Sequence, residues 1–225
     1  MQAKLIDYLK DFISDARWNR INEVLDGRTQ HLTVVLEDIY QPHNASAVLR
    51  SCDGFGIQDV HVIENENQFD ASSQITIGAD QWLSINRYNE EAKDNVSDCF
   101  SNLKNQGFQI VATTPHENDH NLNELDISKP TALVFGTELD GVTDQVMEQS
   151  DAFVKIPMAG FSESFNISVS AAICLYDTST RLRQSDIDWG LSAEKREELL
   201  LEWVKKSIKA GDQLAEKWMK EYTSS

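Results

Sequence analysis

Residues 156–170, IPMAGFSESFNISVS, hold the densest group of side chains in this chain that could bind a ligand. An apolar run ends at Pro157, the chain turns at Gly160, and a helical segment rich in small residues begins after Asn166. Small residues let a ligand approach the backbone closely, and the first N–H groups of a helix have no partner within it. The pattern predicts a strand, a polar binding loop and a helix start. An ordinary strand-to-helix connection, capped by Ser164 or Asn166, would leave the same pattern.

Residues 131–143, TALVFGTELDGVT, begin as a β-branched and apolar run and then break into a loop. Gly136, Glu138 and Gly141 mark the break, which comes just before a helical pattern at 144–149. This segment therefore predicts a buried strand with a loop at its carboxyl end.

Residues 41–57, QPHNASAVLRSCDGFGI, predict a helix that carries Arg50. Asn44 stands where it would cap the start of this helix, and Gly56 follows its end. A guanidinium does not give up its proton readily, so Arg50 is better suited to hold an anionic group such as a phosphate than to act as a base. An ion pair between Arg50 and Asp53 on one face of the helix is the simpler, structural interpretation.

Taken together and in this order, the three segments resemble the three signature motifs of the SpoU (TrmH-type) 2′-O-ribose methyltransferases of the SPOUT superfamily. The resemblance runs from about residue 32 to residue 183, and the terminal segments also resemble those of the branch that methylates tRNA guanosine. It implies methyl transfer from S-adenosylmethionine to a ribose hydroxyl of structured RNA, with a guanosine in the D-loop of tRNA as the expected target. A ribosomal RNA target is one alternative, and an RNA-binding module without catalytic activity is another.

The resemblance also implies roles for individual residues, which are carried over position by position. The expected catalytic residues are Asn44, Arg50, Glu138, Ser164 and Asn166. The expected cofactor-binding residues, which act mainly through backbone groups, are Thr113, Gly136, Ile156 and Phe165. Phe165 replaces the leucine that is usual in the family, an apolar exchange that can alter packing against adenine without removing backbone contacts.

Hydrophobic periodicity predicts an α/β fold with a mainly parallel sheet flanked by helices. Strands are expected at 32–37, 59–64, 83–88, 108–113, 131–135 and 152–156. Helices are expected at about 45–55, 91–106, 144–149 and 166–183, with one or two more between 194 and 222. We expect an N-terminal helical extension (1–31), a methyltransferase domain (32–185) and a C-terminal helical extension (192–225). The resemblance adds a deep trefoil knot, which residue patterns cannot predict, and a homodimer with its cofactor sites near the interface.

The charge is unusual for an RNA-binding protein, because the formal net charge is −17. Residues 1–31 contain five basic and five acidic residues, and residues 192–225 contain seven of each, so the whole excess lies in the middle of the chain. Phosphate binding depends on Lys and Arg, so any RNA is expected to contact the terminal helices. The predicted RNA-binding residues at the N-terminal end are Arg17, Arg20 and Arg28.

Two other motifs point to different protein classes. Residues 116–120 read HENDH and match the zinc-binding pattern H-E-x-x-H, but Pro115 and the surrounding Asn and Asp residues favour a polar loop over the helix that such a site needs. Residues 54–59 begin like a dinucleotide fingerprint, but they lack its third glycine and follow a helix instead of a strand. We therefore expect no metal and no nicotinamide cofactor.

The rest of the composition fits a cytoplasmic protein. The three cysteines are far apart, with no C-x-x-C pair, which gives no sign of a disulfide framework or a zinc site. No secretory signal and no run of about 18 apolar residues is present, so we expect no membrane association.

Overall fold

The computed structural model describes residues 1–69, 76, 78–115, 120–137 and 140–223. The chain divides into two compact units. The larger unit, Thr29–Trp189, contains the sheet, whereas the smaller unit combines Met1–Arg28 with Gly190–Ser225.

The described part of the larger unit contains a seven-stranded sheet in the order β3-β2-β1-β6-β4-β7-β5. Every pair of neighbouring strands is parallel. The strands are β1 (Leu32–Glu37), β2 (Asp59–Ile63), β3 (Ser84–Tyr88), β4 (Gln109–Thr113), β5 (His120–Asn121), β6 (Thr131–Phe135) and β7 (Ala152–Lys155). The predicted α/β class with a mainly parallel sheet is confirmed.

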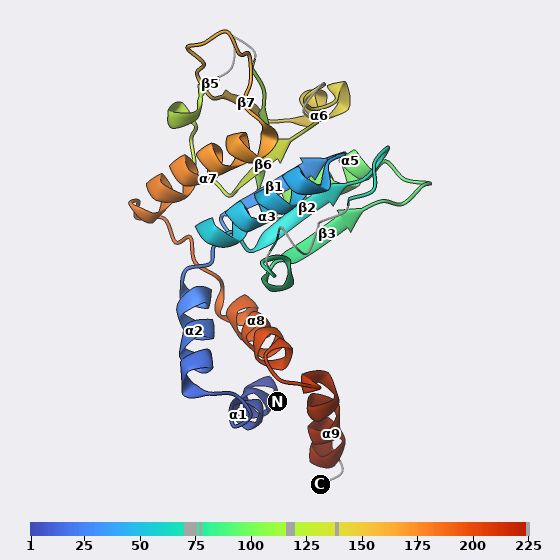
Figure 1. The fold of residues 1–225 in the computed structure, drawn as a ribbon, viewed down its shortest axis with the longest axis vertical. Coiled ribbons are helices and arrows are strands. Elements are labelled where there is room, and N and C mark those ends of the chain that lie inside the picture. Colours follow the sequence, from blue (N-terminus) through green and yellow to red (C-terminus); the bar gives the residue numbers. More distant parts are fainter. Residues whose placement is uncertain (70–75, 77, 116–119, 138–139, 224–225) are drawn as a thin grey trace. The chain divides into compact units, whose positions relative to one another are not determined.

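Helices cover both faces of this sheet (Figure 1), so its central strands are apolar on both sides. In the described part of the unit the helices are α3 (Pro42–Phe55), α5 (Asn95–Asn105), α6 (Asp144–Gln149) and α7 (Ile167–Arg183), with short 3-10 turns at η1 (Asp80–Trp82) and η2 (Leu122–Glu124). Val34 and Leu36 of β1 pack in the core under α3 and α7, and Val35 between them packs in the core under α5 and α6. This alternation is what a strand buried on both faces requires.

Helix α3 begins earlier than the sequence suggested, and this corrects the expectation for Asn44. The N-cap is Gln41 and Pro42 takes the first helical position, so Asn44 lies inside the first turn. Proline suits that position because its fixed φ is helical and its missing N–H has no partner there. At the other end the helix stops at Gly56, whose φ of 79° is left-handed, as expected of a glycine C-cap.

Strand β5 is a second departure from the sequence-based expectation. His120 and Asn121 pair in parallel with Val154 and Lys155 at the edge of the sheet. We expected a polar loop here, because two polar residues carry no strand signal of their own. The segment is a strand because its backbone pairs with β7, not because its own residues favour one.

The smaller unit consists of α1 (Gln2–Lys10), α2 (Asp15–Asp26), α8 (Ala193–Lys206) and α9 (Gly211–Thr223). Helix α8 packs against α1, α2 and α9, so the two ends of the chain share one core. The buried apolar residues of this core are Leu5, Ile6, Leu9, Ile21, Leu25, Leu199, Leu200, Trp203, Val204 and Ala215.

Candidate functional site

A cavity of about 500 Å³ opens at the carboxyl ends of β4, β6 and β7. This is the edge of a parallel sheet at which ligands usually bind, and the volume is in the range of small-molecule sites. The lining residues are Thr113, Thr114, Pro115, Phe135, Gly136, Thr137, Asp140, Gly141, Val142, Asp144, Met147, Val154, Ile156, Met158, Glu163, Ser164, Phe165, Ile167, Ser170 and Cys174.

The four residues predicted to bind the cofactor meet in this cavity. Thr113 ends β4, Gly136 follows β6, and Ile156 follows β7, three strands that are neighbours in the sheet. Phe165 comes from the loop before α7. Of the predicted catalytic residues, Ser164 also lines the cavity. These positions are far apart in the sequence, and the sheet order brings them together.

Gly136 lies at a point where the backbone leaves no room for a side chain. A Cβ atom there would lie 2.0 Å from the carbonyl oxygen of Gly141. Thr137 and Gly141 close this loop with two backbone hydrogen bonds of 2.8 and 3.1 Å. This part of the cavity wall is therefore backbone packed closely against backbone, which only a glycine at position 136 allows.

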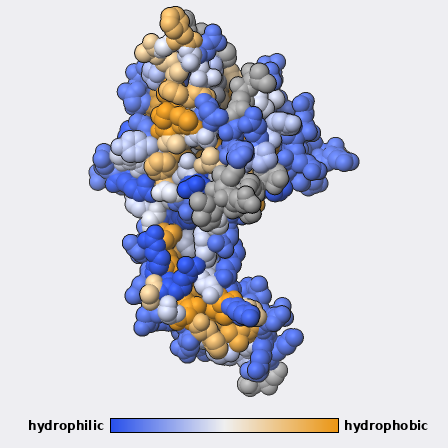
Figure 2. Space-filling model, viewed as in Figure 1, coloured by the Kyte–Doolittle hydropathy of each residue, from blue (hydrophilic) through white to orange (hydrophobic). Residues whose placement is uncertain are grey.

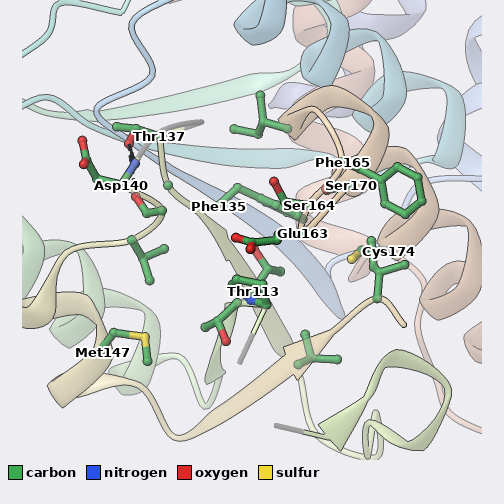
Figure 3. Close-up of a pocket in the computed structure, with 18 of the residues that line it drawn as sticks. Thr113, Phe135, Thr137, Asp140, Met147, Glu163, Ser164, Phe165, Ser170 and Cys174 are labelled. Atoms are coloured by element: carbon green, nitrogen blue, oxygen red, sulfur yellow. Dashed lines mark hydrogen bonds between the residues drawn. The ribbon is translucent and has the colours of Figure 1, made fainter. Parts of the chain in front are cut away.

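The electrostatic character of the cavity was not anticipated from the sequence. Asp140, Asp144 and Glu163 line it, and its described lining includes no basic side chain. Figure 3 shows Glu163 and Ser164 in the space between Thr137 and Asp140 on one side and Cys174 on the other. Such a cavity favours a cationic ligand.

Burial raises the pKa of Cys174 to about 12, so its thiol remains protonated and unreactive.

Asn44 and Asn166 lie side by side although 122 residues separate them. The Nδ2 of Asn166 donates to the Oδ1 of Asn44 at 3.2 Å, and the Nδ2 of Asn44 donates to Oε1 of Gln41 at 3.3 Å. Asn166 is also the N-cap of α7, because its Oδ1 accepts the backbone N–H of Ser168 at 2.9 Å. The structure thus joins the first and third sequence segments next to Phe165 of the cavity.

Arg50 is exposed on α3 and is not part of the cavity lining. Among the described residues it forms no ion pair, so the alternative pairing with Asp53 is not seen. Its guanidinium is therefore accessible to a ligand from solvent. Glu138, the remaining predicted catalytic residue, lies outside the described residues.

The three arginines predicted to bind RNA have different surroundings within the smaller unit. Arg17 and Arg20 are exposed; the Nε of Arg17 donates to Ser207 at 3.0 Å, and Arg20 pairs with Glu23 at 2.8 Å. Arg28 is only 1% exposed, and its guanidinium lies 5.2 Å from the ring centroid of Trp203. The prediction for Arg28 is therefore corrected, because a buried cation–π contact leaves its guanidinium inaccessible to phosphate.

The H-E-x-x-H segment gives no support for a metal centre. Residues 116–119 lie outside the described residues, and His120 is an exposed residue of β5, not of a helix. Across the described ranges, no three His, Cys, Asp or Glu side chains gather as a metal site would require. Within the same ranges no helix has the length and apolarity needed to cross a bilayer.

Comparison with known proteins gives consistent results. Residues 31–176 match the sequence model of the SpoU rRNA Methylase family. A tRNA (guanosine(18)-2'-O)-methyltransferase of Borreliella burgdorferi is 41% identical over 206 residues, which are 92% of each chain. The enzyme of the same name from Thermus thermophilus is 34% identical over 86% of this chain and 98% of its own. The crystal structure of a TrmH/SpoU tRNA modifying enzyme from A. aeolicus superposes with a TM-score of 0.76, at 33% identity, over 87% of this chain and 98% of its own.

Proposed function

The chain belongs to the SpoU rRNA Methylase family, and from this premise we propose that it is an S-adenosylmethionine-dependent 2′-O-ribose methyltransferase that acts on tRNA. The expected acceptor is the guanosine of the D-loop that the names of its relatives number 18. Those relatives match 206 and 195 residues, more than the larger unit Thr29–Trp189 contains, so the match extends into the smaller unit. This supports tRNA over ribosomal RNA as the substrate.

The observation that carries this proposal is the meeting of Thr113, Gly136, Ile156 and Phe165 in one cavity. The tightly packed backbone at Gly136 forms part of the cavity wall, and Phe165 offers an apolar ring for a base. S-adenosylmethionine, which carries a positively charged sulfonium, supplies an electrophilic methyl group when it is bound. The acidic lining formed by Asp140, Asp144 and Glu163 suits that charge.

The five predicted catalytic residues have complementary proposed roles. Arg50 holds a phosphate of the RNA and stabilises the alkoxide that develops on the 2′-oxygen, because a fixed positive charge favours the ionised hydroxyl. The phosphate that Arg50 holds accepts the hydroxyl proton. Asn44 and Asn166, already joined by a hydrogen bond, orient the ribose, and Ser164 contributes a short hydroxyl at the rim. Glu138 is proposed, from its position in the motif, to shape the loop after Gly136.

The same family membership supports three further proposals about the whole protein. The chain is proposed to thread through itself in a trefoil knot that includes the cavity, and to act in the cytoplasm as a homodimer.

Exposed apolar side chains on α7 and the loop before it support a dimer contact surface in this region. They are Phe161, Phe165, Val169 and Tyr176. Figure 2 shows hydrophobic residues gathered on the face where α7 lies. Sedimentation of the purified protein measures the dimer directly.

The proposed function is tested by incubating the purified protein with total RNA and labelled S-adenosylmethionine. We expect label in the tRNA fraction, on a single guanosine. Label in the ribosomal RNA would support the alternative substrate that the family name suggests. Cofactor binding without transfer to any RNA would point to an RNA-binding module that has lost its catalytic activity.

A further inference from the structure

Glu37 is the last residue of β1, and its side chain is only 1% exposed. It does not line the cavity, and no motif of the sequence singled it out. We propose that Glu37 is a positioning residue that holds the cavity wall formed by residues 140–144 in the shape that binds the cofactor. This inference rests on the proposed function, because it concerns the same cavity.

Both carboxylate oxygens of Glu37 are bonded to one residue that is 106 positions away. Oε2 accepts the backbone N–H of Thr143 at 2.9 Å, and Oε1 accepts its Oγ1 hydroxyl at 2.6 Å. A carboxylate has acceptors only, so it matches these two donors completely. Such charge-assisted bonds are stronger than those between neutral groups.

Thr143 is the point at which this restraint acts on the cavity wall. Its Oγ1 also accepts the N–H of Val146 at 3.3 Å, which makes Thr143 the N-cap of α6. The residues before it, Gly141 and Val142, and the residue after it, Asp144, all line the cavity. Glu37 therefore fixes the junction between the lining loop and the helix that follows.

The upstream end of the same wall is held by a separate restraint. Gly136 continues directly from β6, and Thr137 is paired with Gly141 through backbone hydrogen bonds. If Thr143 lost its anchor, the loop would remain tied to β6 but its downstream half could move. The expected consequence is a weaker cofactor site in a protein that is still folded.

Glu64 provides a matched control, because it is a buried carboxylate at the same edge of the sheet. It follows β2, is 9% exposed, and accepts the N–H of Phe69 at 2.7 Å and the Nδ2 of Asn89 at 3.3 Å. It also forms an ion pair with Arg87 at 3.5 Å. None of these three partners lines the cavity. Glu64→Gln thus imposes the same chemical change on a buried carboxylate without touching the wall.

The experiment measures S-adenosylmethionine affinity by calorimetry and the melting temperature for the full-length wild type and five variants. These are Glu37→Gln, Thr143→Val, the double variant that combines the two, Thr143→Ser and Glu64→Gln. An amide offers only one acceptor to the two donors of Thr143, so Glu37→Gln should raise the Kd roughly tenfold, the effect of losing one such hydrogen bond. Thr143→Val should raise the Kd by a similar factor. The Kd of the double variant should be no higher than that of either single variant, because both changes break the same contact. Thr143→Ser keeps both donors and should restore wild-type affinity, and Glu64→Gln should leave the Kd unchanged.

Steady-state kinetics separates positioning from a general loss of structure. For Glu37→Gln we expect a higher KM for S-adenosylmethionine, with kcat at saturating cofactor and KM for RNA near the wild-type values. Unchanged affinity in Glu37→Gln, or an equal loss in Glu64→Gln, would overturn the inference. A wild-type protein that does not bind S-adenosylmethionine would instead overturn the proposed function, and the inference with it.

Discussion

At the scale of single residues, the proposed site combines groups that line the cavity with one cation, Arg50, that lies outside the lining. The backbone around Gly136 and the acidic lining can hold a cofactor, whereas Arg50 is exposed on α3 and free of ion pairs among the described residues. The ion pairs of the described residues therefore give Arg50 no structural role. Its availability is consistent with the proposed contact to the RNA backbone.

Arg50→Lys tests this role, because it keeps the charge and removes the planar fork that can hold a phosphate through two bonds. We expect kcat to fall by a factor of about a hundred or more, since removal of one such transition-state contact has roughly that effect. The affinity for S-adenosylmethionine should not change, because Arg50 is not part of the cavity lining. Arg87→Lys is the control, because it makes the same exchange at a half-exposed arginine whose partner is Glu64. Near-normal turnover in Arg50→Lys would remove Arg50 from the mechanism.

At the scale of elements, the cavity depends on the turn that follows β6. The Thr137–Gly141 pairing brings a carbonyl oxygen against Gly136, so this position accepts no Cβ atom. Two backbone hydrogen bonds hold Thr137 against Gly141, and the bond from Thr143 to Glu37 anchors the segment that follows.

Gly136→Ala is therefore expected to displace the turn and to abolish measurable cofactor binding, with a loss of stability of about 1–3 kcal/mol from the steric conflict. Gly54→Ala is the control, because a Cβ atom there meets nothing within 4 Å and alanine is favoured in a helix. Calorimetric titration and thermal melting of both variants provide the test. Wild-type cofactor affinity in Gly136→Ala would show that this turn does not form the binding wall.

The sheet also contains a buried histidine that makes the fold sensitive to acid. Burial lowers the pKa of His61 from 6.5 to about 4, so the unfolded chain binds this proton first as the pH falls. Stability should therefore decrease between about pH 6.5 and pH 4, by at most about 3 kcal/mol from this residue. His61→Gln should flatten that decrease in denaturant titrations at several pH values, whereas replacement of the exposed His120 should not. Identical pH profiles for wild type and His61→Gln would contradict this account.

Much of the sheet could be predicted from the sequence, and the reasons are visible in particular elements. The predicted bounds of β1, β6 and α6 agree with the structure because β-branched runs, glycines and a threonine cap are local signals. The start of α3 was missed because two capping patterns, Gln41 before Pro42 and Asn44, overlap. The acidic cavity and the Glu37–Thr143 contact depend on strand order, which no local pattern contains.

At the scale of the whole molecule, the acidic charge and the proposed RNA substrate have to be reconciled. The larger unit carries the negative excess, and the smaller unit has near-balanced charges that form many surface ion pairs. Exposed pairs of this kind contribute about 0–1 kcal/mol each, so phosphate groups can replace their acidic partners at little cost.

The long-range packing of α8 against α1 and α2 also explains why Arg28 was misjudged from the sequence, since its partner Trp203 lies at the other end of the chain.

Replacing Arg17 and Arg20 with Gln should therefore weaken tRNA binding and reduce its salt dependence. Each lost phosphate contact should lower the slope of log K against log salt by roughly 0.7–0.9. Arg28 is left intact, because its replacement would disturb the core that it shares with Trp203. Titrations at several salt concentrations give the slopes. If affinity and slope stay at wild-type values, these two arginines do not contact the RNA.

The central claim is that the methyl group goes to a ribose 2′-oxygen, and one measurement tests it most directly. Two synthetic tRNAs are compared with labelled S-adenosylmethionine, one unmodified and one in which only guanosine 18 is replaced by 2′-deoxyguanosine. The base, its pairing edges and the surrounding phosphates are the same in both, so only the acceptor oxygen differs. We predict full incorporation into the first tRNA and none into the second. Equal incorporation into both would contradict the account, because the methyl group would then be on another atom.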